Sequence, residues 1–147
     1  MVNNFARTPK GSDRDQMKAV AANVGDVAVV NTYYVGKLLN SKKRTEVEVG
    51  KKMGVFFPNQ NGNGTHVNIS GAGVTKYSKN KENAVKLLEF LVSPKAQGMY
   101  GKRNKEYPAN QNVEPSELLK SWVTFKEDTL AFEELGKNNA KAVIIFN

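Results

Sequence analysis

The chain has 147 residues, of which 39% are hydrophobic and 24% charged, a composition typical of a folded globular domain rather than a disordered one. It contains no cysteine, which excludes disulfides, thiolate metal ligands and cysteine nucleophiles, and its single histidine excludes a zinc site built from several imidazoles. The formal net charge of +8 raises the question of an anionic partner.

The N-terminal part is predicted to be a helix followed by a buried strand. Ser12 and Asp15 form a variant capping box that predicts a helix over residues 13–23, ended by Gly25. Its apolar residues repeat at helical spacing and predict one buried face: Met17, Val20, Ala21 and Val24. The short, continuously apolar run at 27–30, in which three of the four residues are β-branched, is typical of a strand covered on both sides.

Asn31 is predicted to cap a second helix that carries Tyr33 and Tyr34, and a helical or turn segment is predicted over 43–52. The tightest basic run, residues 42–44, lies at the start of that segment and is followed at once by two glutamates. We interpret the run as a solvated helix face. A basic nucleic-acid-binding module remains the alternative from another functional class.

A stretch made entirely of turn formers, residues 58–64, is the strongest break in the sequence. A short strand is predicted on each side of it, over 55–57 and over 66–69. Alternation of short strands with helices indicates an α/β protein.

Most of the second half is predicted to be helical. Asn80 is expected to cap the clearest helix, whose apolar face comprises Ala84, Leu87, Leu88 and Leu91. The Ser93-Pro94 pair favours the start of another helix, because proline suits a first helical turn. Two further helices are predicted near 115–121 and over 129–145.

Two features are weak functional signals. The segment Gly71-Ala72-Gly73 lacks the third glycine and the ribose-binding acid of a dinucleotide-binding loop, which favours a simple bend in the backbone. His66 lies beside a turn, where a lone histidine is more often structural than a ligand or general base. Neither feature indicates an enzyme.

The adjacent tyrosines Tyr33 and Tyr34 are the informative pair. Phenolate is a hard anionic oxygen donor, and a highly charged cation can displace its proton. Neighbouring helical residues point about 100° apart, so two tyrosines converge on one ion only at an irregular or first-turn position. The junction after Val30 is such a position. From the pattern alone, two half-buried packing residues remain the simpler interpretation.

Collinear stretches across nearly the whole chain resemble the ferric-iron-binding proteins of bacterial ABC importers. The stretches that carry this resemblance include Phe5-Ala6-Arg7, Gly25-Asp26-Val27-Ala28, Asn31-Thr32-Tyr33-Tyr34, Gly54-Val55-Phe56-Phe57-Pro58, Gly64-Thr65-His66-Val67-Asn68, Asn80-Lys81-Glu82-Asn83-Ala84, Glu106-Tyr107-Pro108 and Asn112-Val113-Glu114-Pro115. The resemblance implies the two-lobed, type II periplasmic binding-protein fold. The chain departs from the family pattern at Gly101-Lys102-Arg103, at Val123 and at Ala131-Phe132.

The resemblance also implies a site and its ligands. Tyr33 and Tyr34 match the paired-tyrosine motif with which the family holds Fe(III). Arg7, Ser12 and Asn31 lie where the family places polar groups near the cleft, which implies that they hold a synergistic anion such as carbonate, phosphate or citrate. The implied protein is a solute-binding component, not an enzyme. An importer component for another anion or small solute is the alternative within the same fold.

The resemblance further implies a location, partners and a division of the chain. Family members are roughly twice as long, so the chain is expected to be the C-terminal part only. The expected partners are an inner-membrane permease and the missing N-terminal part, with no nucleic acid, and the expected compartment is the periplasm, although the chain shows no signal peptide. Residues 1–64 and 107–147 are assigned to the second lobe and residues 65–106 to the first. Under-covered apolar faces predict self-association.

Overall fold

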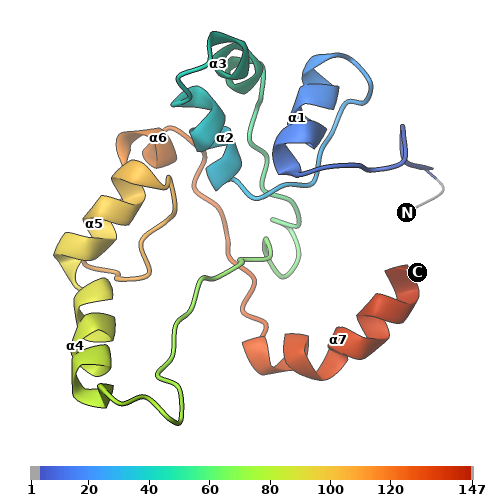
Figure 1. Cartoon of the computed structure of the whole chain (residues 1–147). Coiled ribbons are helices and arrows are strands. Elements are labelled where there is room, and N and C mark those ends of the chain that lie inside the picture. The colour runs from blue at the N-terminus through green and yellow to red at the C-terminus, as the bar shows by residue number, and fades with distance from the viewer. Residues whose placement is uncertain (1–3, 147) are drawn as a thin grey trace. The chain divides into compact units, whose positions relative to one another are not determined.

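The structure is a computed structural model that describes residues 4–146, except for the side chain of Phe146. The ends of the predicted lobe segments 1–64 and 107–147, namely residues 1–3 and Asn147, therefore lie outside the described residues. The described backbone contains seven α-helices: α1 (Asp13–Ala21), α2 (Tyr33–Leu39), α3 (Arg44–Lys51), α4 (Lys81–Leu91), α5 (Pro94–Arg103), α6 (Glu117–Lys120) and α7 (Phe132–Phe146) (Figure 1). No described helix is both long enough and apolar enough to cross a membrane.

The chain divides into two compact units. The first contains the residues up to Val55 together with Ser70–Val123, and therefore α1 to α6. The second contains Phe56–Ile69 and the residues from Thr124 onward, including α7. The boundaries of these two units differ from those of the predicted lobe segments, which are 1–64, 65–106 and 107–147. That assignment concerns a longer molecule and stays a prediction.

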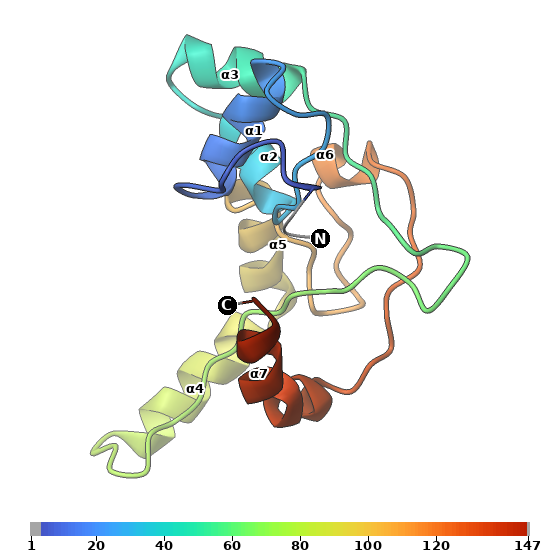
Figure 2. The same cartoon turned by 90° about the vertical axis from the view of Figure 1, so that its right-hand side faces the viewer.

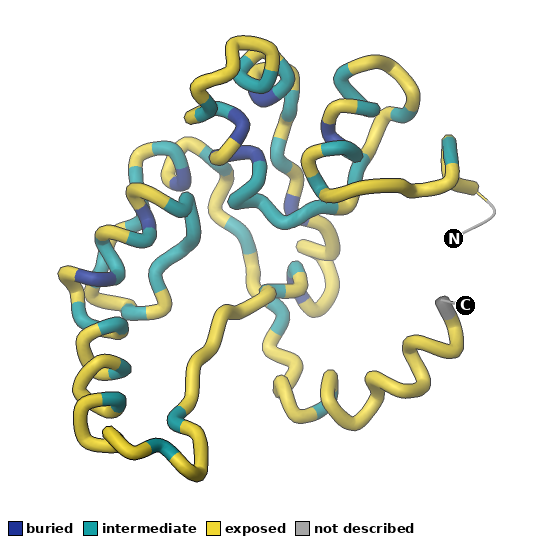
Figure 3. Tube along the Cα trace, viewed as in Figure 1, coloured by how far each residue is buried: buried dark blue, intermediate teal, exposed yellow. Residues whose placement is uncertain are grey.

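The core of the first unit lies where α2 packs against both α1 and α3. Its buried side chains are Met17, Val35 and Leu38, and Leu38 is completely inaccessible to solvent. Partly buried residues surround them: Val30, Tyr34, Leu39, Val49, Met53, Val55 and Trp122. Gly50 allows the close approach of α3, because a β-carbon there would lie 3.0 Å from the Leu39 amide nitrogen. Figure 3 shows these buried positions on α1 to α3.

The predicted first helix is confirmed, with two corrections at its end. The Asp15 carboxylate accepts a hydrogen bond from the Ser12 amide (2.8 Å), as expected of a capping box. The helix ends at Ala21, before Gly25, because Asn23 takes the left-handed conformation with φ +59°. Val24 therefore lies beyond the helix and is exposed, so its assignment to the buried face is wrong.

The predicted strands do not form among the described residues. Residues 27–30, 55–57 and 66–69 are coil, and Figures 1 and 2 draw no strand arrow there. Val27 and Val29 are 85% and 93% exposed, which contradicts a strand covered on both faces. A strand requires a hydrogen-bonded neighbour, and the one β-bridge within residues 4–146 joins Thr65 to Glu127.

The second half of the first unit contains α4, α5 and α6. The predicted helices α4 and α5 are confirmed, and they pack against each other. No residue of α4 is buried, and Leu87 on its predicted apolar face is 56% exposed. At the junction, the Ser93 side chain accepts a hydrogen bond from the Ala96 amide (3.4 Å), and Pro94 occupies the first turn of α5.

The second unit is organised around the turn that the sequence predicted at 58–64. The rings of Phe57 and Phe125 stack with centroids 4.0 Å apart. The Lys126 amide donates to the Gln60 side-chain oxygen (2.6 Å), and the Thr65 amide donates to the Lys126 carbonyl (2.8 Å). Gly64 has φ +109°, so glycine suits this turn and leaves room for the neighbouring backbone.

Candidate functional site

The paired tyrosines lie at the first turn of α2. Thr32 is the N-cap, one position later than the predicted Asn31, and Tyr33 is the first helical residue. The two rings lie side by side, with centroids 4.2 Å apart and planes inclined by 31°. Both side chains are half-buried, and Tyr34 packs against the α1–α3 core. The predicted proximity of the two phenol groups is therefore confirmed.

The two hydroxyl groups are hydrogen-bonded to each other, and this bond is the main reason that the pKa of Tyr33 is raised to about 12. Desolvation and the negative charges of Asp13 and Glu106 raise this pKa further. Without a bound cation Tyr33 is therefore held in its neutral form at neutral pH. A cation of high charge must displace protons before it can coordinate both oxygens.

Lys37 places a positive charge against the same pair. Its ammonium nitrogen lies 4.6 Å from the centroid of the Tyr33 ring and 5.3 Å from that of Tyr34, within the range of a cation–π interaction. Lys37 follows Tyr33 by four residues on one helix, a spacing at which side chains meet. Lys37 was not among the predicted site residues, although the i, i+4 spacing was a usable signal.

Asn31 connects the start of α2 to the start of α1. Its backbone amide donates to the Asp13 carboxylate (2.8 Å), and its side-chain amide lies 3.4 Å from the same oxygen. Asp13 is also one of the charges acting on Tyr33. The predicted Asn31 therefore does lie beside the tyrosine pair. Asp13 was missed, and nothing in the local sequence distinguishes it from an ordinary first-turn acid.

Arg7 and Ser12 lie around the first turn of α1 and are bonded to that helix. The Arg7 guanidinium donates to the Asp15 carbonyl (3.3 Å) and to the Gln16 side-chain oxygen (3.0 Å). The Ser12 amide and hydroxyl bond the Asp15 carboxylate, which lowers the pKa of Asp15. None of the hydrogen bonds found within residues 4–146 joins Arg7 or Ser12 to either tyrosine. Their role as anion ligands stays a prediction.

The donor set suits a hard cation but is small. Two phenol oxygens lie together, and no group of three His, Cys, Asp or Glu side chains in the described part of the chain could hold a metal ion. His66 is exposed, and open space surrounds Gly71 and Gly73. Ferric iron prefers oxygen ligands such as phenolate, so the pair fits this ion while leaving most of its coordination to other groups.

Comparisons with known proteins agree on one family. A family model described as bacterial extracellular solute-binding protein matches residues 1–127. The chain is 45% identical over 146 residues to iron uptake protein A1 of Synechocystis sp., covering 99% of this chain and 41% of that protein.

Solved structures give the same result for the fold. A ferric binding protein from Campylobacter jejuni superposes with a TM-score of 0.94 at 46% identity, covering 99% of this chain and 46% of that one. A Trichodesmium protein (IdiA, FutA) in complex with iron and citrate ligands superposes with a TM-score of 0.91 at 50% identity, covering 97% and 45%. The chain therefore spans less than half the length of the relatives it matches.

Proposed function

Since this chain belongs to the bacterial extracellular solute-binding proteins, we propose that it is part of the ferric-iron-binding component of an ABC importer. In this role the protein carries Fe(III) as its cargo to a permease in the inner membrane and performs no chemistry on it. The observation that carries the proposal is the tyrosine pair, because the phenol rings of Tyr33 and Tyr34 lie side by side at the start of α2.

The predicted fold is confirmed at the level of the family. The ferric-binding structures of Campylobacter jejuni and Trichodesmium share this chain's backbone over nearly its whole length. The α/β character expected of that fold is not visible within residues 4–146, where the strand segments are unpaired coil. We attribute the difference to missing neighbours, since the chain matches about 45% of each solved structure.

The chemistry assigned to the pair is proton exchange for metal. Tyr33, with its pKa of about 12, and Tyr34 must both lose a proton when they coordinate Fe(III) as phenolates. Protonated Tyr33 is thus part of the metal-free state. The nearby negative charge of Asp13 favours a bound cation, whereas the Lys37 ammonium opposes it and must move when the metal arrives.

The remaining coordination is assigned to groups outside the pair. A synergistic anion (carbonate, phosphate or citrate) would occupy part of the metal's coordination shell, with Arg7, Ser12 and Asn31 as its proposed partners. The Trichodesmium relative carries iron and citrate together, which supports this arrangement. Further ligands and the first lobe would come from an N-terminal part, which is also proposed to supply neighbours for residues 27–30. The periplasm is the compartment that this role requires.

Ferric citrate titration tests the proposal. Fe(III) bound to phenolate absorbs visible light, so wild-type chain should develop a coloured band that Tyr33→Phe and Tyr34→Phe each reduce. Because outer-shell changes alone cost about 10–100-fold in metal affinity, loss of a direct ligand should cost at least about 100-fold. Tyr77→Phe, which alters a fully solvated tyrosine, is the matched control. Equal colour in all four proteins would show the assignment to be wrong.

A further inference from the structure

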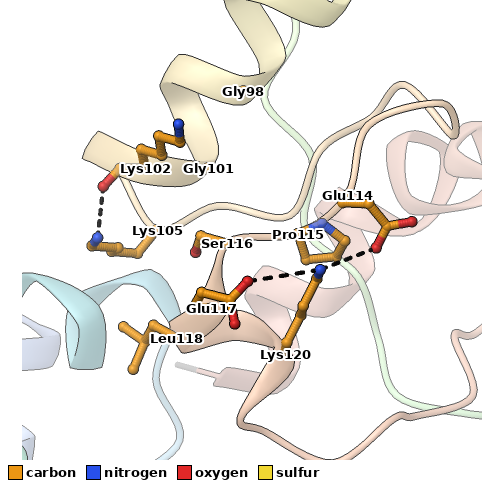
Figure 4. Close-up of a pocket in the computed structure, with 10 residues that line it drawn as sticks. All are labelled: Gly98, Gly101, Lys102, Lys105, Glu114, Pro115, Ser116, Glu117, Leu118 and Lys120. Carbon is orange, nitrogen blue, oxygen red and sulfur yellow. Dashed lines mark hydrogen bonds and ion pairs between the residues drawn. The ribbon is translucent and has the colours of Figure 1, made fainter.

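A cavity of 440 Å³ lies in the first unit between the C-terminal half of α5 and the segment that leads into α6. Figure 4 shows its lining, which combines small residues with charged side chains: Gly98, Gly101, Lys102, Lys105, Glu114, Pro115, Ser116, Glu117, Leu118 and Lys120. The lining contains three lysines and two glutamates, so it carries a net positive charge. Part of it, Gly101-Lys102, is where the sequence departs from the family pattern.

Ser116 is the first sign that the cavity has a polar occupant. Its hydroxyl oxygen is buried and has no hydrogen-bond partner among the described residues. Buried hydroxyls are nearly always satisfied, because leaving one without a partner is costly. Ser116 lines the cavity, and Figure 4 shows its hydroxyl beneath the surface of the lining, on the side that faces Lys105. A ligand oxygen in the cavity would supply the missing partner.

Lys105 is the second sign. Its φ of +62° places it in the left-handed region just after α5, a position that favours glycine. Its side chain also requires Gly36 on α2, where a β-carbon would lie 2.5 Å from Lys105 Cβ. A lysine held in a conformation unfavourable to it indicates that the side chain itself has a use. One N–H of its ammonium bonds the Lys102 carbonyl (2.6 Å), which leaves two donors.

Lys120 completes the positive side of the cavity. Its ammonium lies 3.4 Å from the Glu114 carboxylate and 3.8 Å from that of Glu117. Both carboxylates are largely exposed, so these ion pairs are weak, and a bound anion can compete with them. In Figure 4 Ser116 lies between Lys105 and Lys120. The lining thus contains one unpartnered hydroxyl together with the ammonium groups of Lys105 and Lys120.

We propose that this cavity binds a small oxyanion carrying two or more negative charges, held by the Ser116 hydroxyl and by the ammonium groups of Lys105 and Lys120. Phosphate and short dicarboxylates share this chemistry, since each presents several oxygen acceptors within a small volume. Gly98 and Gly101 leave the wall without side chains, so an anion can approach the backbone of α5. This site is separate from the tyrosine pair and does not depend on the proposed transport of iron.

Calorimetric titration of the iron-free chain with inorganic phosphate, and separately with malonate, tests the site. Ser116→Ala and Lys105→Gly should each weaken binding about tenfold, the usual cost of one hydrogen bond to a charged group. Both variants should fold, because Ser116 makes no capping bond to α6 and glycine is favoured at position 105. Lys95→Gln is the matched control, because Lys95 is an exposed lysine of α5 that does not line the cavity.

The outcomes separate this site from the anion site proposed near α1. Binding that survives Arg7→Gln but is weakened by Ser116→Ala supports the cavity. Binding that is lost in Arg7→Gln and unchanged in Ser116→Ala overturns the proposal, and so does the absence of any saturable heat with either anion. A loss in Lys95→Gln equal to that in Lys105→Gly would also overturn it, because the effect would then reflect overall charge.

Discussion

Helices α2 and α4 belong to the same unit and both carry apolar residues at helical spacing, yet their environments are opposite. In α2, Leu38 is completely buried against α1 and α3. In α4, Leu87 is more than half exposed, and none of the helix's residues is buried. The comparison teaches that periodicity identifies the apolar face of a helix but not whether the chain itself contains the surface that covers it.

The same contrast decides where function can be located. The tyrosine pair lies on the packed helix, whose core fixes the direction of the first turn and therefore the position of both rings. The α4 face has no such support, and in a longer protein it would need a neighbour. A preorganised site on a rigid element is the arrangement that ligand binding requires.

The largest expected effect comes from truncating one leucine in each helix, which tests whether α2 is packed in a core while α4 is not. Leu38→Ala should lower the free energy of unfolding by about 2–5 kcal/mol, because it opens a cavity in the core. Leu87→Ala should change it by less than about 0.5 kcal/mol, as expected at an exposed position. Urea denaturation followed by circular dichroism measures both. Similar losses in the two variants would mean that α4 is covered in solution.

The helices were predictable because capping residues and apolar spacing are local. The start of α1 at Ser12 and that of α5 at Ser93-Pro94 follow from side chains within one turn. Whether residues 27–30 form a strand could not be predicted in the same way. Their β-branched side chains favour the extended conformation, but a strand also needs backbone hydrogen bonds to a neighbouring strand. Without that neighbour Val29 stays in coil and almost fully exposed.

The candidate site was predicted to a similar extent. Adjacent tyrosines at a helix start could be found from sequence, and the structure places their rings together. Asp13 could not be identified from the sequence, because the hydrogen bond that its carboxylate accepts from the Asn31 amide joins residues far apart in the chain. The orphaned hydroxyl of Ser116 depends on packing around α6 and has no sequence signature.

The exposed apolar face of α4 should cause the chain to self-associate. The exposed face that includes Leu87 and Phe90 is apolar, and contiguous exposed apolar surface promotes association. We expect concentration-dependent oligomers of the wild-type chain in sedimentation velocity. Leu87→Gln combined with Phe90→Gln should weaken association at least about tenfold, since each buried side chain contributes about 1.5–3 kcal/mol. The exposed pair Lys81→Gln and Lys86→Gln is the control, and oligomers that respond equally to it would contradict the role of α4.

A smaller and more local effect is expected in α2, where the pKa of Tyr33 depends on the hydroxyl of Tyr34. Tyr34→Phe removes the hydroxyl that raises the pKa of Tyr33 to about 12, so that pKa should fall toward its ordinary value of 10.0. NMR titration of the Tyr33 ring measures the shift. Because the folded-state pKa is the higher one, the Tyr33 contribution to stability is complete below about pH 10 and is lost as the pH rises toward 12. A Tyr33 pKa unchanged in the variant would show that burial, not the hydroxyl, controls it.

The smallest expected effect concerns the junction of α4 and α5, where Ser93 caps α5. Ser93→Ala removes the bond between the serine oxygen and the Ala96 amide, leaving an unsatisfied donor at the start of α5. A capping serine contributes about 0.5–2 kcal/mol, and the long 3.4 Å bond places this one near the lower end. Amide hydrogen exchange should show the loss as faster exchange in the first turn of α5, with α2 unchanged. Ser70→Ala, in an exposed irregular segment, controls for loss of a hydroxyl. If exchange in α2 rises as much as in α5, the two regions unfold as one cooperative unit, and the distinction between a helix held by a core and a helix held by its caps fails.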